Sequence, residues 1–150
     1  MGMKRLVAAV ATGAAIVATV TGCGADDTES IKPITHEIDS LRAEIKMESA
    51  AVDAHDTDAK DHVESVRMTA EYVTPKLAGL AEDAPSETRT FANAAHAWAE
   101  AVLTSRTAIL DQAGEDTGTL ALTNVGLAAR TLDQEAEDLG VGGWESVHDL

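Results

Sequence analysis

The stretch DAHDTD, residues 53–58, decides whether the first half of this chain forms one helix or two. Apolar residues recur at every seventh position from Ile31 to Leu80, a period that suits one long helix in a coiled-coil-like hairpin. Aspartate and threonine, however, compete with the helical backbone for hydrogen bonds and favour caps and turns. A second apolar column also changes sides between Leu41 and Val63. We therefore expect the chain to turn within this stretch.

With this turn in place, the sequence divides into four helical segments of similar length. The expected helices are residues 31–52, residues 57–82, a third from Ala84-Pro85-Ser86 to Gly114, and a fourth that ends at a glycine cap at Gly140. Each carries apolar residues spaced three and four apart, which indicates one buried face. These stripes are Ile31, Ile34, Ile38, Leu41 and Ile45; Val63, Val66, Ala70, Val73, Leu77 and Leu80; Phe91, Ala95, Trp98, Val102, Ser105 and Ile109; and Leu122, Val125, Ala129, Leu132, Ala136 and Leu139. The predicted fold class is all-α, an up-down four-helix bundle with short loops. The alternative is three helices, with one long first helix in a coiled-coil-like hairpin.

The composition excludes several classes of function. The 150 residues include 26 acidic and 11 basic residues, a formal net charge of −15, whereas nucleic-acid binding needs a cluster of lysine and arginine. The single cysteine, Cys23, excludes an internal disulfide framework and a zinc site built from thiolates. The sequence contains no serine-nucleophile elbow, phosphate-binding glycine loop or His-Glu-x-x-His helix. We therefore expect no nucleic-acid partner and no enzymatic activity.

The first 23 residues have the organisation of an export signal. Lys4-Arg5 forms a short positive segment, and the run from Leu6 to Gly22 carries no charge. That run is shorter than the roughly 20 apolar residues that cross a bilayer. Its end, Val20-Thr21-Gly22-Cys23, resembles the lipobox of bacterial lipoproteins, which the lipoprotein signal peptidase cuts before the cysteine.

The resemblance implies three regions in the chain. Residues 1–22 would be removed as the signal peptide, residues 23–30 would be the lipidated cysteine with a short polar tether, and residues 31–150 would form the acidic helical bundle. The diacylglycerol on Cys23, with palmitate-type chains, would anchor the protein on the extracytoplasmic face of the cell membrane, because two acyl chains suffice for stable anchoring. Loss of Lys4-Arg5 would leave 9 basic and 26 acidic residues, so the net charge of the mature chain becomes −17.

The turn stretch also contains the best candidate for a metal site. Asp58 and His62 are four residues apart and would share a helix face, and His55 can fold back beside them if the chain turns near Asp56. Imidazole and carboxylate ligands together suit zinc, copper, nickel or iron. The other interpretation is a solvated acidic turn whose aspartates cap helices. His55, Asp58 and His62 are thus candidate ligands for a divalent metal. Our main expectation, however, is that the protein has no cofactor other than the covalent lipid.

The end of the fourth expected helix and the segment after it form a candidate partner surface. Acidic residues crowd the last turns of this helix, among them Asp133, Glu137 and Asp138. A helix C-terminus favours cations, so carboxylates there can dock a basic partner. The other interpretation is that they only keep the helix soluble. Trp144 follows a glycine pair and either folds onto the bundle or anchors a partner. Gly126, inside the same helix, predicts close approach of another helix or a crevice beside Trp98.

Three functions are compatible with these features. The first is a non-enzymatic envelope lipoprotein whose helical bundle binds another envelope protein or has an accessory role. The second is an extracytoplasmic module that binds or senses metal through the Asp/His cluster at 53–62. The third comes from resemblance alone: some prophages carry small helical lipoproteins that exclude superinfecting phage, and this chain is similar to them in size and expected anchoring.

Overall fold

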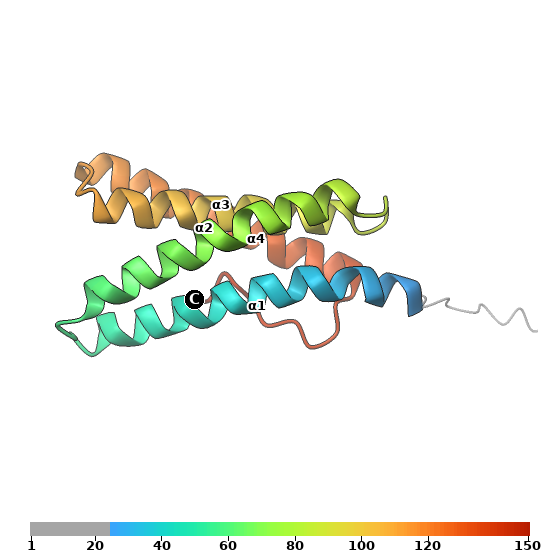
Figure 1. Cartoon of the computed structure of the whole chain (residues 1–150), viewed down its shortest axis with the longest axis horizontal. Coiled ribbons are helices and arrows are strands. Elements are labelled where there is room, and N and C mark those ends of the chain that lie inside the picture. The colour runs from blue at the N-terminus through green and yellow to red at the C-terminus, as the bar shows by residue number, and fades with distance from the viewer. Residues whose placement is uncertain (1–24) are drawn as a thin grey trace, which may run out of the picture.

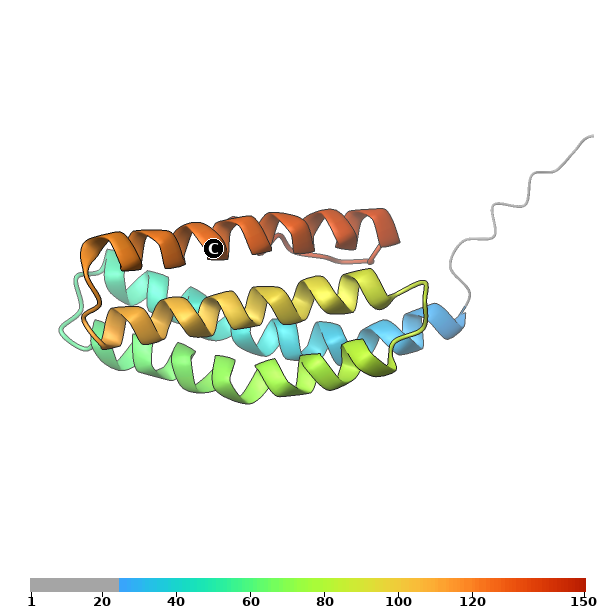
Figure 2. The ribbon, with the colours of Figure 1, turned by 90° about the horizontal axis from the view of Figure 1, so that it is seen from above.

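The computed structural model describes residues 25–150, which form four α-helices joined by short loops and contain no strand (Figure 1). The helices are α1 (Ala25–Asp53), α2 (Ala59–Asp83), α3 (Arg89–Leu110) and α4 (Glu115–Leu139). Successive helices run in opposite directions, so the fold is an up-down four-helix bundle, as the sequence predicts (Figures 1 and 2). The alternative with one long first helix is wrong.

The break between α1 and α2 follows from the residues of the 53–58 stretch. His55 adopts a left-handed backbone conformation, with φ of 53°, in which histidine is found more often than most residues. The carboxylate of Asp56 accepts a hydrogen bond from the backbone N–H of Asp58 at 3.1 Å. This local bond competes with helical hydrogen bonding, and α2 begins at the next residue.

The predicted apolar stripes form the core of the bundle. The stripes of α1 and α2 are buried almost throughout, and Trp98 and Phe91 of α3 are the largest fully buried side chains. α1 packs on α2, α2 on α3 and α3 on α4, and α1 also touches α3 across the diagonal. Two predicted core residues differ: Ile109 and Leu122 are 41% and 50% exposed, because no element covers them at their end of the bundle.

Two of the helices continue through a proline. α1 begins at Ala25 and contains Pro33, so residues 25–30, expected to form a tether, are helical. α2 likewise continues through Pro75. Burial of the apolar stripe on both sides of each proline outweighs the loss of one backbone hydrogen bond, since packing supplies most of the stability of a helix in a protein.

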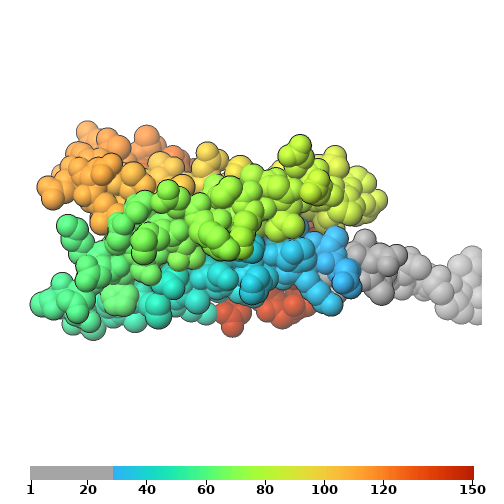
Figure 3. Space-filling model, viewed as in Figure 1, coloured from blue at the N-terminus to red at the C-terminus, as the bar shows by residue number. Residues whose placement is uncertain are grey.

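The contact between α1 and α4 that would close the bundle is missing. Within residues 25–150, no Cα atom of α1 comes within 8 Å of a Cα atom of α4. The last ten residues, 141–150, lie between these helices instead, and we call them the tail (Figures 1 and 2). Gly140 permits the reversal after α4, because it has φ of 69° and its backbone N–H bonds back to α4. This confirms the predicted glycine cap, and Figure 3 shows the tail exposed along one side of α1.

Candidate functional site

One carboxylate of α4 holds the tail. Asp133 accepts hydrogen bonds from the indole Nε1 of Trp144 at 3.0 Å and from the hydroxyl of Ser146 at 2.7 Å. It also accepts hydrogen bonds from the backbone N–H groups of Val147 and His148, at 2.9 and 3.1 Å. All four donors belong to the tail, so one side chain fixes the path of the tail and helps to bury Val147 against the core.

These donors change the acidity of Asp133. Partial burial disfavours the charged carboxylate, but the hydrogen bonds from the tail favour it and outweigh the effect of burial. The pKa of Asp133 therefore lies below its ordinary value. At neutral pH the side chain is ionised, and the tail supplies the groups that stabilise its charge.

Trp144 joins the tail to three helices of the bundle. Its ring meets Phe91 of α3 edge to face, with 5.6 Å between the ring centroids. The guanidinium carbon of Arg42 of α1 lies 5.0 Å from the centroid of the Trp144 ring. Both arrangements are favourable for an aromatic ring. Because Asp133 also bonds to Trp144, this one side chain connects α1, α3 and α4.

Polar contacts tie the rest of the tail to α1. Arg42 donates a hydrogen bond to the backbone carbonyl of Glu145, and Lys46 Nζ lies 2.7 Å from Glu145 Oε2. The hydroxyl of Ser49 donates to the carbonyl of Leu150 at 3.3 Å. The Lys46 pair is exposed and contributes little, whereas Arg42 is buried. The tail thus replaces the missing contact between α1 and α4.

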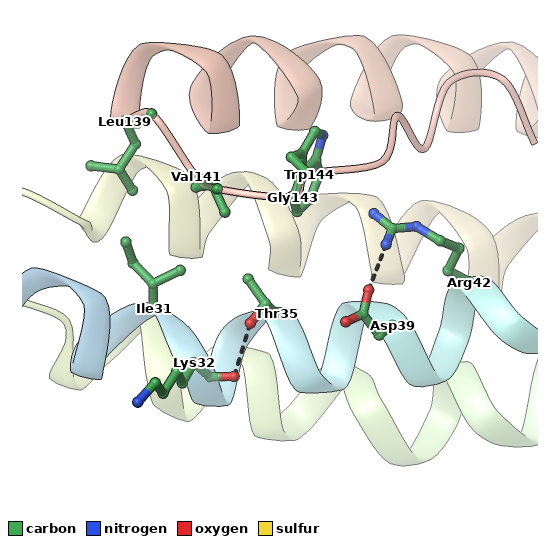
Figure 4. Close-up of a pocket in the computed structure, with 11 residues that line it drawn as sticks. Ile31, Lys32, Thr35, Asp39, Arg42, Leu139, Val141, Gly143 and Trp144 are labelled. Atoms are coloured by element: carbon green, nitrogen blue, oxygen red, sulfur yellow. Dashed lines mark hydrogen bonds and ion pairs between the residues drawn. The ribbon is translucent and has the colours of Figure 1, made fainter.

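A slot of about 400 Å³ lies between the first half of α1 and the start of the tail (Figure 4). Ile31 of α1 and Val141 of the tail point toward one another across it, and Trp144 stands further along. Asp39 and Arg42 form an ion pair at that end, and the Nε of Arg42 is buried without a hydrogen-bond partner. An apolar slot with one polar end can receive a side chain of a partner protein or a small amphipathic molecule.

A second cleft, of about 180 Å³, opens where the tail ends, and we call it the tail-end cleft. Trp98 of α3, Leu122 and Gly126 of α4 and Leu150 of the tail are among its lining residues. A Cβ atom at Gly126 would meet no other atom within 4 Å, so no helix approaches closely there. The structure therefore contradicts close helix approach at Gly126 and places a cleft beside Gly126 and Trp98. Ligand binding in this cleft stays a prediction.

A buried ion pair crosses the diagonal of the bundle close to this cleft. Arg106 Nε of α3 lies 2.9 Å from Glu48 Oε2 of α1, and both side chains are only 10% exposed. Arg106, which lines the tail-end cleft, also donates a hydrogen bond to the hydroxyl of Ser105 at 2.9 Å. The pair joins two helices that otherwise touch little, and neither charge has access to much water.

Sequence reasoning missed this pair, although the signal is present. The spacing of three and four along α1 continues from Ile45 to Glu48 and then to Val52, so a glutamate stands at a core position. A charged residue at such a position is rarely buried unless it is paired. Arg106, four residues after the core residue Val102, supplies the opposite charge.

The three candidate metal ligands lie around the turn between α1 and α2. His55 Nδ1 is 3.1 Å from the carbonyl oxygen of Asp53, and Asp58 accepts a hydrogen bond from the hydroxyl of Thr57 at 3.4 Å. His62 is in the first turns of α2 and is half-buried. Within the described part of the chain, no group of three His, Cys, Asp or Glu side chains lies close enough to hold a metal ion. Metal binding by His55, Asp58 and His62 stays a prediction.

The candidate partner surface divides into two parts. Asp133 and Trp144 bond to each other and hold the tail of the chain itself. Glu137 and Asp138 are exposed on α4, where Asp138 accepts a hydrogen bond from Gln134 at 2.9 Å. Only the second part therefore presents its acidic groups to solvent.

The predicted lipidation site precedes the described residues, because Cys23 and the signal segment lie before Ala25. Among the helices described, none combines the length and the apolar character that a membrane span requires. No family model, no curated protein and no solved structure matches the chain.

Proposed function

We propose that this protein is a lipoprotein anchored on the extracytoplasmic face of the cell membrane, where its helical bundle binds another envelope protein and catalyses no reaction. The observation that carries the proposal is the sequence Val20-Thr21-Gly22-Cys23, at the end of an uncharged run that follows Lys4-Arg5. Two acyl chains on Cys23 would give stable anchoring. The acyl chains would have to supply it, because an anionic membrane surface repels the negative charge of the mature chain.

The position of α1 supports an anchored arrangement. α1 begins at Ala25, two residues after Cys23, so an anchor there would hold the start of α1 beside the membrane. With 29 residues, at about 1.5 Å per residue, α1 is about 44 Å long. The loops 54–58 and 111–114 lie at the opposite end of the bundle from the start of α1 (Figures 1 and 2). Because the acidic surface opposes flat adsorption, these loops would face away from the membrane.

The surface of the bundle supports a binding role. The slot beside Ile31 and the tail-end cleft beside Leu122 are two hollows with apolar walls on the same side of the molecule, between α1 and α4. Hollows of this kind receive the anchoring side chains of a partner protein.

Replacing Cys23 tests the anchor. In a bacterial host, the wild-type chain should partition into the detergent phase, and mass spectrometry should find a mature N-terminus at Cys23 that carries diacylglycerol. Cys23→Ser should stay uncleaved and lose the lipid. Thr21→Ala should behave as wild type, because alanine is common at this position of lipoboxes. A wild-type protein with an unmodified Cys23 in the aqueous phase would overturn the proposal.

A further inference from the structure

Past the end of the tail, no described segment lies between α1 and α4 (Figures 1 and 2). The tail reaches Ser49, about one turn before the end of α1, and stops short of the loops at this end of the bundle (Figures 1 and 2). Beyond this point, three residues at core positions of their helices are half exposed: Val52 (52%), Ile109 (41%) and Leu122 (50%). Val52 and Ile109 continue stripes whose neighbouring members Ile45 and Ser105 are buried. Leu122 is followed in its stripe by Val125, which is partly buried. Of the three, Leu122 lines the tail-end cleft. We call the three residues together with this cleft the far-end groove.

Exposed acidic side chains crowd the end of the bundle at which the far-end groove lies. The two segments that form this end of the bundle, residues 49–62 and 107–122, contain seven acidic residues and one basic residue, Lys60. All seven carboxylates are exposed: Asp53, Asp56, Asp58, Asp61, Asp111, Glu115 and Asp116. Figure 3 shows the two loops as separate lobes at this end. This end of the bundle is therefore strongly negative, and we call these seven carboxylates the acidic rim.

The tail shows how a polypeptide covers the space between α1 and α4. It lies between the two helices without forming a helix itself, buries Val147, places Trp144 against Phe91, and gives two backbone N–H groups to Asp133. An incoming segment that follows the same groove would use the same kind of contacts: an apolar side chain inserted between the helices and hydrogen bonds to polar side chains at the edges.

We propose that the far-end groove binds an extended, basic segment of another protein, with one apolar side chain of that segment in the tail-end cleft beside Leu122. Lysine or arginine side chains on the segment would meet the acidic rim, so charge complementarity selects the partner. A second copy of this chain is disfavoured, because it would bring another seven carboxylates to the same place. This inference rests on the proposed partner binding and names its surface, but it does not depend on acylation of Cys23.

A pair of synthetic peptides tests the inference. One peptide alternates lysine with valine and tryptophan, and the other has glutamate in place of each lysine. Each is labelled and titrated with the full chain in a non-ionic detergent, which keeps the chain dispersed whether or not Cys23 is acylated. Protein-free detergent is the blank, and fluorescence anisotropy reports binding. We expect the lysine peptide to bind with micromolar affinity, to weaken as salt is added, and the glutamate peptide not to bind.

Two leucines of α4 provide a matched comparison. Leu122→Gln removes an apolar wall of the groove and should weaken binding of the lysine peptide about tenfold, the effect of losing one anchoring contact. Leu127→Gln changes an equally exposed leucine (57%) that is not among the lining residues of the cleft, and should leave the affinity within about twofold. Both positions are exposed, so neither change should prevent folding, and circular dichroism checks this.

A second variant tests the acidic rim separately. The triple change Asp111→Asn, Glu115→Gln and Asp116→Asn should also weaken binding and should reduce its dependence on salt. Failure of the lysine peptide to bind at millimolar concentration, or equal binding by Leu122→Gln and Leu127→Gln, would overturn the inference. Self-association that Leu122→Gln abolishes would instead assign the groove to a second copy and would also overturn it. Loss of the anchor would appear only in the partitioning experiment on Cys23, so the two failures are distinguishable.

Discussion

At the scale of single residues, acidic side chains that look alike in the sequence have different roles. Asp133 follows the fully buried Leu132 and lies at the border of the buried face of α4, where the tail can reach it. Glu137 and Asp138 lie nearer the end of the helix and face solvent. Composition and spacing could identify the cluster, but only the path of the tail distinguishes its members.

Asp133→Asn should release the tail. The amide keeps one acceptor oxygen but turns an NH₂ group toward donors, so hydrogen bonds are lost and a destabilisation of about 2–4 kcal/mol follows. The indole N–H resonance of Trp144 should move toward its value in the unfolded chain. Trp98, which is buried in the core, serves as the internal reference. An unchanged Trp144 resonance would show that other contacts hold the tail.

Acid should release the tail as well. The pKa of Asp133 is lower in the folded protein than its ordinary value, so its contribution to stability is complete above about pH 4 and is lost as the pH falls through the lowered value. We therefore expect a step in the Trp144 signal below about pH 4. The same titration of Asp133→Asn should lack this step, and a step of equal size there would assign it to other carboxylates.

Replacing one residue of the Glu48–Arg106 pair should lower the free energy of unfolding more than replacing both residues. Either Glu48→Met or Arg106→Met leaves an unpaired charge that is about nine-tenths buried, and about 3–5 kcal/mol should be lost. The double variant should recover much of that loss, because no buried charge remains. Urea unfolding measures both effects, with Lys46→Met, which breaks an exposed pair, as a control expected to lose less than about 1 kcal/mol. Additive losses in the double variant would contradict this account.

At the scale of elements, the sequence was informative wherever a period was present. The stripes and the 53–58 turn predict the four helices, because burial of one face and local hydrogen bonds by aspartate are encoded within a few residues of each other. The start of α1 was missed, because residues 25–30 carry no apolar stripe and were assigned to the polar tether. The tail has no period, and its hydrogen bonds to Asp133 join residues whose approach no local spacing reveals.

Gly126 of α4 and Gly140, which caps the end of α4, should respond in opposite ways to alanine. Gly140→Ala forces a Cβ atom into a left-handed conformation (φ 69°), which should cost about 1 kcal/mol and loosen the tail. Gly126→Ala has open space and a helical backbone, and it should gain up to about 1 kcal/mol. Chemical unfolding of the two variants measures the difference, and a loss in Gly126→Ala would mean that the tail-end cleft needs the missing side chain.

At the scale of the whole molecule, charge is unbalanced. In the described part of the chain, five basic side chains already pair with carboxylates: Arg42, Lys46, Arg67, Lys76 and Arg106. Most of the carboxylates in this part therefore have no basic partner, and they repel one another.

Added salt should stabilise the fold. Screening weakens repulsion among the unpaired carboxylates more than it weakens the pairs that are partly buried, so the urea midpoint should rise between low salt and physiological ionic strength. Sodium and potassium chloride should act alike, since screening does not depend on the identity of the cation. A falling midpoint would mean that the ion pairs dominate the electrostatic free energy.

The missing contact between α1 and α4 has a consequence for the order of folding. Apart from the diagonal contact of α1 with α3, each helix packs on its neighbour in the sequence, and such local topologies are typical of chains that fold fast. The bonds from Arg42 and Lys46 to Glu145 instead join residues that are 103 and 99 positions apart. A chain that leaves the ribosome N-terminus first can therefore assemble its helices one after another. Its first and last helices become linked only when the tail emerges and docks between them.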